Sequence, residues 1–141
     1  MSTKYHIAQV NIAHLIAPQG DSRVQDFFDN VPPINELAEN SEGFIWRYTD
    51  DYPDPLVAFN MSVWDSIESL TNYAYRSDHV KIFRRRDEWI KPSKKPHLAL
   101  WWVVEGEMPT MQQGLDKLKL LDEKGPHQHA FTFANRFDPP S

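Results

Sequence analysis

Two strand-like segments carry the polar residues best suited to chemistry. Residues 5–16 contain Asn11, and residues 56–64 contain Asn60, Ser62 and Trp64. If these two strands are neighbours in a sheet, Asn11 falls on the same face as Asn60 and Ser62. Polar side chains on a face that is otherwise buried are costly unless they are hydrogen-bonded. They predict either a pocket lined with polar groups or amide pairs that only satisfy the sheet.

His79 is the histidine most suited to acid–base chemistry. It follows Ser77-Asp78, where a helix is expected to break. An imidazole titrates near neutral pH, so His79 could serve as general base or acid, bond a ligand or hold a haem iron. The alternative is a partly buried histidine that fills the seam between helix and sheet.

Three further side chains flank His79. Tyr73 and Arg76 come just before the helix break, and Arg86 lies on the same helical arc as His79. The tyrosine could donate a hydrogen bond to an oxyanion, and either arginine could hold an acidic group. The alternatives are core packing for the tyrosine and ordinary surface ion pairs for the arginines.

Metal and thiol chemistry have little support. His127 and His129 have a spacing that puts both on one face of a strand, but no third ligand is close in sequence. The alternative, a solvated loop, is favoured, so no metal and no other cofactor are predicted. The chain has no cysteine, which excludes disulfides, thiol catalysis and cysteine-bound clusters.

Composition excludes further classes. The chain has 141 residues, which fits one domain spanning residues 1–141, and its aromatic share of 13% is high. A net charge of −5 argues against a general nucleic-acid binder, and the basic run of residues 84–86 is flanked by acidic residues. No apolar run has membrane-spanning length and no signal-peptide pattern is present, so a cytoplasmic protein without membrane or nucleic-acid partners is expected.

Alternating hydrophobicity and turn residues predict five strands. The expected strands span residues 5–16, 44–49, 56–64, 97–104 and 130–137. The turn residues at 50–55 predict a hairpin between the second and third. The unbroken apolar run of the fourth is typical of burial on both faces, so Trp101 and Trp102 must point to opposite sides of the sheet.

Capping residues and apolar spacing predict the helices. Ser22 with Gln25 is a capping box that begins the first helix, and Pro32-Pro33 is expected to stop or kink it. A short helix is expected to resume over residues 34–39.

Two more helical stretches follow. Asp65 is the expected N-cap of a helix that breaks near Arg76 and resumes over residues 78–90. Thr110 with Gln113 predicts the start of a last helix, and Gly125-Pro126 predicts its end.

The resulting order is β-α-β-β-α-β-α-β, and its first six elements form the ferredoxin-like α+β pattern, with an extra C-terminal helix and strand. The helices of such a sheet lie on one face only, while the other face carries apolar residues that must be covered. A second copy is the expected cover, which predicts a homodimer that closes into a dimeric α/β barrel.

Several motifs resemble a known group of enzymes. The run from Trp64 to Leu70, followed by Ser77-Asp-His79 and Phe83, resembles the pattern of antibiotic-biosynthesis monooxygenases. Nearly the whole chain is more similar to an uncharacterised bacterial family of the same dimeric α/β-barrel superfamily. The segments that carry this second resemblance are residues 9–12, 60–64, 75–79, 84–89, 97–102, 125–126 and 130–133.

The resemblance implies a cofactor-independent monooxygenase acting on a phenolic, anthrone-like or polyketide-like ligand, which is small and hydrophobic or aromatic. His79 would be the proton acceptor, while Asn11, Trp64 and Tyr73 would orient the substrate.

Two alternatives remain open. One is haem binding or degradation; by helix alignment, however, Tyr73 and Arg84 stand where the superfamily's haem degraders have a tryptophan and the proximal histidine. The other is a non-catalytic dimeric ligand-binding or stress-related module.

Overall fold

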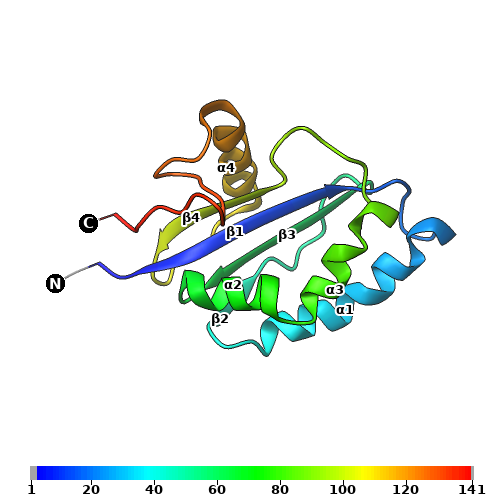
Figure 1. Cartoon of the computed structure of the whole chain (residues 1–141), viewed down its shortest axis with the longest axis horizontal. Helices are drawn as coiled ribbons and strands as arrows, with labels where there is room; N and C mark the ends of the chain where they lie inside the picture. Colours follow the sequence, from blue (N-terminus) through cyan, green and yellow to red (C-terminus); the bar gives the residue numbers. More distant parts are fainter. Residues whose placement is uncertain (1–2, 141) are drawn as a thin grey trace.

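A four-stranded antiparallel sheet forms the centre of the computed structural model (Figure 1). The structure describes residues 3–140, apart from the side chains of Ile82 and Phe83, so the phenylalanine of the monooxygenase-like pattern lies outside the described part. The sheet order is β2-β3-β1-β4. The strands are β1 (Tyr5–His14), β2 (Phe44–Arg47), β3 (Val57–Trp64) and β4 (Leu98–Val104).

The register confirms that the two polar-rich strands are neighbours. Asn11 of β1 is opposite Asn60 of β3, and Gln9 is opposite Ser62. Because side chains alternate along a strand, these four share one face, and Val10 points to the other.

The helices α1 (Gln25–Glu39), α2 (Ile67–Arg76) and α3 (His79–Arg84) lie together on one side of the sheet (Figure 1). Ala38 of α1 and Ile67 and Leu70 of α2 pack there against Ile7 and Trp64. This arrangement is the expected ferredoxin-like α+β fold. The face that carries the amides is therefore the face that these helices cover.

The expected end of the first helix at Pro32-Pro33, with a separate helix over residues 34–39, is wrong. One helix runs from Gln25 to Glu39, preceded by a 3-10 turn over Ser22–Val24. Both prolines are exposed. Proline has no backbone N–H, so the carbonyl four residues before each one has no partner within the helix, and on the solvent side it can bond water instead. The capping box at Ser22 is also wrong, because Asp21 accepts the capping hydrogen bond from the Arg23 N–H instead.

The break before His79 is confirmed, with two differences of detail. Ser66, not Asp65, caps α2 by accepting from the Ser69 N–H. The helix after the break is shorter than the expected 78–90, because α3 ends at Arg84 and a 3-10 turn over Arg86–Glu88 follows.

The last helix, α4 (Met111–Lys124), begins with the predicted capping box of Thr110 and Gln113. The final strand over residues 130–137 is wrong. Phe131 exchanges two backbone hydrogen bonds with Leu100, and the chain then turns away. The Thr132 hydroxyl accepts from the Asn135 N–H, a local bond that competes with strand pairing.

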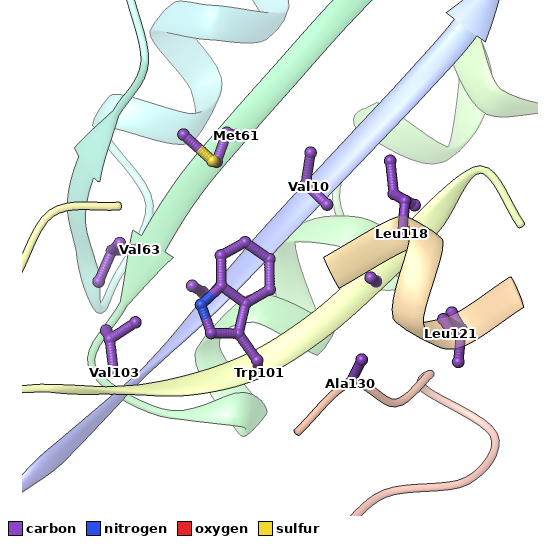
Figure 2. Packing of buried hydrophobic residues seen from close by; sticks show 10 residues of the cluster. Val10, Met61, Val63, Trp101, Val103, Leu118, Leu121 and Ala130 are labelled. Atoms are coloured by element: carbon purple, nitrogen blue, oxygen red, sulfur yellow. The ribbon is translucent and has the colours of Figure 1, made fainter. Parts of the chain in front are cut away.

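The second face of the sheet is covered in part by the chain itself. Leu118 and Leu121 of α4 join Val10 and Trp101 in one buried cluster, as Figure 2 shows. The backbone of α4 at Gly114 lies so close to the sheet that a Cβ there would be 2.9 Å from the Met61 sulfur. A half-buried apolar strip remains toward β2, formed by Ile45, Trp46, Tyr48 and Phe59.

Among residues 3–140, no helix is both long enough and apolar enough to cross a membrane.

Candidate functional site

A hollow of about 1160 Å³ is lined by the polar face of the sheet and the helices that cover it, and it extends to the opposite face, where Phe59 and Leu118 line it. The part on the helix side is called the groove below. Its lining includes Asn11, Asn60, Tyr73 and His79. Apolar side chains of α1 line it as well, namely Phe27, Phe28, Val31 and Ile34. The groove thus combines an aromatic and aliphatic wall with a few polar groups, which is the usual character of a small-molecule site.

A hydrogen-bond network fixes the polar floor of this groove. The side-chain amide of Gln9 donates to Asn60 Oδ1 at 2.6 Å and to Ser62 Oγ at 2.8 Å. The same hydroxyl accepts from Trp64 Nε1 at 2.8 Å. Both amide protons of Gln9 are therefore used, and the Asn60 oxygen is occupied. The Asn60 NH₂ group is left as the donor available to a ligand.

Three rings lead from the core to the groove. Trp64 is fully buried and stacks on Tyr73, with ring centroids 5.0 Å apart. Tyr73 in turn lies 4.9 Å from the imidazole of His79. The network and the ring stack share Trp64, so the amide floor and the histidine are held by one buried side chain.

The hydrogen bonds of His79 define its tautomer. Nδ1 lies 3.2 Å from the carbonyl oxygen of Ala74, which can only accept. Nδ1 therefore carries the proton, and Nε2 keeps its lone pair. Burial lowers the pKa of His79, because it disfavours the charged ring, and the bond to Ala74 opposes this only in part. The side chain is a neutral imidazole at neutral pH and can accept a proton.

Tyr73 keeps its proton. Burial raises the pKa of Tyr73 to about 12, and the positive charge of Arg47 opposes that rise. Its hydroxyl is 3.5 Å from the Ile34 carbonyl, at the limit of a hydrogen bond. The phenol is therefore a donor at neutral pH.

Arg47 belongs to the site, although it is not among the residues predicted from the sequence. Simple alternation along residues 44–49 puts Phe44 and Arg47 on opposite faces. A β-bulge between Phe44 and Trp46 adds one residue, so Arg47 is opposite Ser62 and lines the groove. Periodicity alone cannot reveal such an insertion.

The other sequence-predicted residues take different positions. Ser62 and Trp64 are buried beneath the groove and support it without lining it. Arg86 lines the groove, and burial, helped by the charge of Arg86, lowers the pKa of His97. Arg76 is exposed, bonds Asn72 Oδ1 at 3.1 Å and lies away from the groove lining.

The histidine pair of the C-terminal loop stays apart from this site. The rings of His127 and His129 are 6.0 Å apart, and His127 Nδ1 bonds the Gly125 carbonyl. Within the described residues, no three metal-ligating side chains come together.

Solved structures similar to this chain share its fold. A conserved protein from Methanosarcina mazei Go1 has a TM-score of 0.55 at 20% identity, over 68% of this chain and 90% of its own. A candidate antibiotic biosynthesis monooxygenase from Nitrosomonas europaea has a TM-score of 0.51 at 9% identity, over 77% and 94%. A protein of unknown function from Nitrosomonas europaea has a TM-score of 0.51 at 10% identity, over 77% and 99%.

No curated protein matches the sequence. A family model does match, over residues 6–141, and it is described as a domain of unknown function, DUF3291. This match includes every residue of the groove named above. The chain belongs to the DUF3291 family.

Proposed function

We propose that this protein is a small-molecule monooxygenase that works without a cofactor and oxidises a phenolic or anthrone-like substrate. The observation that carries the proposal is His79, a neutral imidazole with a free Nε2 beside a groove walled by aromatic side chains. The similarity of fold to a candidate monooxygenase agrees with it but shows the fold alone.

The chemistry needs one base and dioxygen. His79 Nε2 removes a proton from an acidic C–H or O–H of the substrate, which leaves an electron-rich enolate. The enolate carbon bonds one oxygen atom of O₂ and forms a hydroperoxide once protonated. For a methylene group, loss of water from this hydroperoxide leaves a carbonyl, so CH₂ and O₂ become C=O and H₂O.

The polar groups of the groove would stabilise the enolate. The Asn60 NH₂ group and the Tyr73 hydroxyl are donors, and each can bond the negative oxygen. Asn11, opposite Asn60 on β1, adds a second amide to the same floor. Trp64 would act only through its stacking on Tyr73 and its bond to Ser62.

The test uses purified protein with 1,8-dihydroxy-9-anthrone as substrate and an oxygen electrode as detector. Turnover should persist in EDTA, since no metal is involved in the proposed reaction. His79→Ala should lower kcat by about 100-fold or more, the usual effect of losing a general base. His129→Ala is the matched control, because that histidine is exposed and does not line the groove. Equal turnover in the wild type and the His79 variant would refute the assignment.

We also propose that the half-buried strip of β2 and β3 is where two copies meet. Trp46, Tyr48 and Phe59 are only partly covered within one chain, although they adjoin a buried cluster. Sedimentation equilibrium should give twice the monomer mass, and Phe59→Asp should shift the equilibrium toward monomer. A monomeric wild type at high concentration would contradict this proposal.

The haem alternative has less support. At the position of the superfamily's proximal ligand stands Arg84, which cannot ligate iron. A haem titration without a Soret shift is the expected result.

A further inference from the structure

We propose that Arg47 makes the groove selective for aromatic ligands that carry a negative charge, such as a carboxylate. This inference deepens the proposed function, since it names the substrate class of the same groove. Its starting point is the position of Arg47 on β2, opposite Ser62, among the residues that line the groove.

The guanidinium of Arg47 has unused hydrogen-bonding capacity. Its Nε is buried and makes no hydrogen bond to any described residue. The nearest carboxylate oxygen is Glu39 Oε2 at 3.6 Å, which is an ion pair too long for a hydrogen bond. Glu39 is half-exposed, whereas the Arg47 side chain is only 24% exposed. A partly desolvated arginine with one loose partner favours a ligand that offers a planar pair of oxygens.

The neighbours of Arg47 define where such a ligand would lie. Arg47 and Tyr73 both line the groove, and the positive charge of Arg47 opposes the rise in the pKa of the Tyr73 hydroxyl. Ile34 of α1 accepts weakly from this hydroxyl and also lines the groove. The anionic end of a ligand would thus lie between β2 and α1, and its ring against the apolar side chains of α1.

The hollow carries charges of both signs, since Asp50 and Asp51 line it together with Arg86, Lys91 and Lys95, and all of these side chains are exposed. The Arg47 side chain is only 24% exposed, so water screens its attraction for an anion less.

The test compares two probes of the same shape. 2-Naphthoate carries a carboxylate, and 2-naphthamide replaces it with a neutral amide. Binding is measured by isothermal calorimetry on the intact protein. The wild type should bind the naphthoate about 10- to 100-fold more tightly, as expected for charge-assisted hydrogen bonds to arginine.

Two variants isolate the role of Arg47. Arg47→Met should remove the preference for the naphthoate and leave the affinity for the naphthamide within about twofold, since burial of the ring is unchanged. Arg76→Met is the matched control, since it makes the same charge change away from the groove and should keep the preference. Arg47→Lys, which keeps the charge but loses the planar fork, should retain part of it.

Three results would overturn the inference: equal affinity of the wild type for both probes, no binding of either probe, or an undiminished preference in the folded Arg47→Met protein. Neither probe contains an oxidisable methylene. The anion preference is therefore measured independently of monooxygenase turnover, and each proposal can fail without the other.

Discussion

Replacing Gly114 with alanine sets two opposing effects against each other in α4. Alanine is the better helix former, which by itself would add about 1 kcal/mol to the free energy of unfolding. The new methyl group, however, would lie 2.9 Å from the Met61 sulfur and 3.1 Å from Val10 Cγ2. Val10 is a stiff β-branched residue in the middle of β1, so it cannot move aside easily.

Overpacking of this kind costs about 1–3 kcal/mol, which exceeds the gain in helix propensity. The expected result for Gly114→Ala is a net loss of about 1 kcal/mol, or roughly 3 °C in Tm for a domain of this size. Urea unfolding followed by tryptophan fluorescence measures the loss. Glu123→Ala, at an exposed position of the same helix, should change stability by less than about 0.5 kcal/mol.

The contact with Met61 can be tested directly with a double-mutant cycle. In a Met61→Ala background the sulfur is gone, and the added methyl group is close only to Val10. Gly114→Ala should then cost less than in the wild type, with a coupling of about 1 kcal/mol between the two positions. The reasoning would be refuted if Gly114→Ala raised the stability of the wild type, or if its cost were the same in both backgrounds.

Two further predictions concern the floor of the groove and its histidine. Ser62→Ala removes the buried acceptor of the Trp64 and Gln9 N–H donors and should lower the free energy of unfolding by about 1–3 kcal/mol. Ser93→Ala, at an exposed position, should lower it by almost nothing. Equal urea midpoints for the two variants would contradict the network. Because burial lowers the folded pKa of His79 below its ordinary 6.5, the unfolded chain binds more protons, and stability should fall as the pH drops below about 6.5. His79→Gln should reduce this slope between pH 5 and 7 in pH-dependent urea unfolding, and an unchanged slope would show that the ring does not contribute.

Alternation of apolar and polar residues predicted most of the strands, because successive side chains of a strand point to opposite faces of the sheet. The placement of Asn11 opposite Asn60 needed only the alternation of side chains and the order of strands, and the register confirms it. Arg47 escaped the same reasoning because a single extra residue in β2 reverses the faces beyond it. Such a bulge is decided by packing between strands and leaves no mark in the local spacing.

The helices show a similar division between local and tertiary causes. Capping at Thr110 follows from two side chains and was predictable. Continuation of α1 through Pro32-Pro33 was not, because it depends on the proline rings facing solvent while other side chains of the helix pack inward. Phe131 likewise pairs with Leu100 for one residue only, because Thr132 accepts from the Asn135 N–H and turns the chain locally.

The amide floor can also be hydrogen-bonded in the opposite direction. Trp64 Nε1 can only donate, but the Ser62 hydroxyl can turn its own proton toward Gln9 once that amide is reversed. Asn60 would then donate to Gln9 and present its oxygen to the groove. The three bonds among these side chains keep the same heavy atoms and distances, so no backbone has to move, but the Gln9 NH₂ group then turns away from Asn60 and Ser62. The floor can accept from a ligand hydroxyl before proton loss and donate to the resulting oxyanion afterwards.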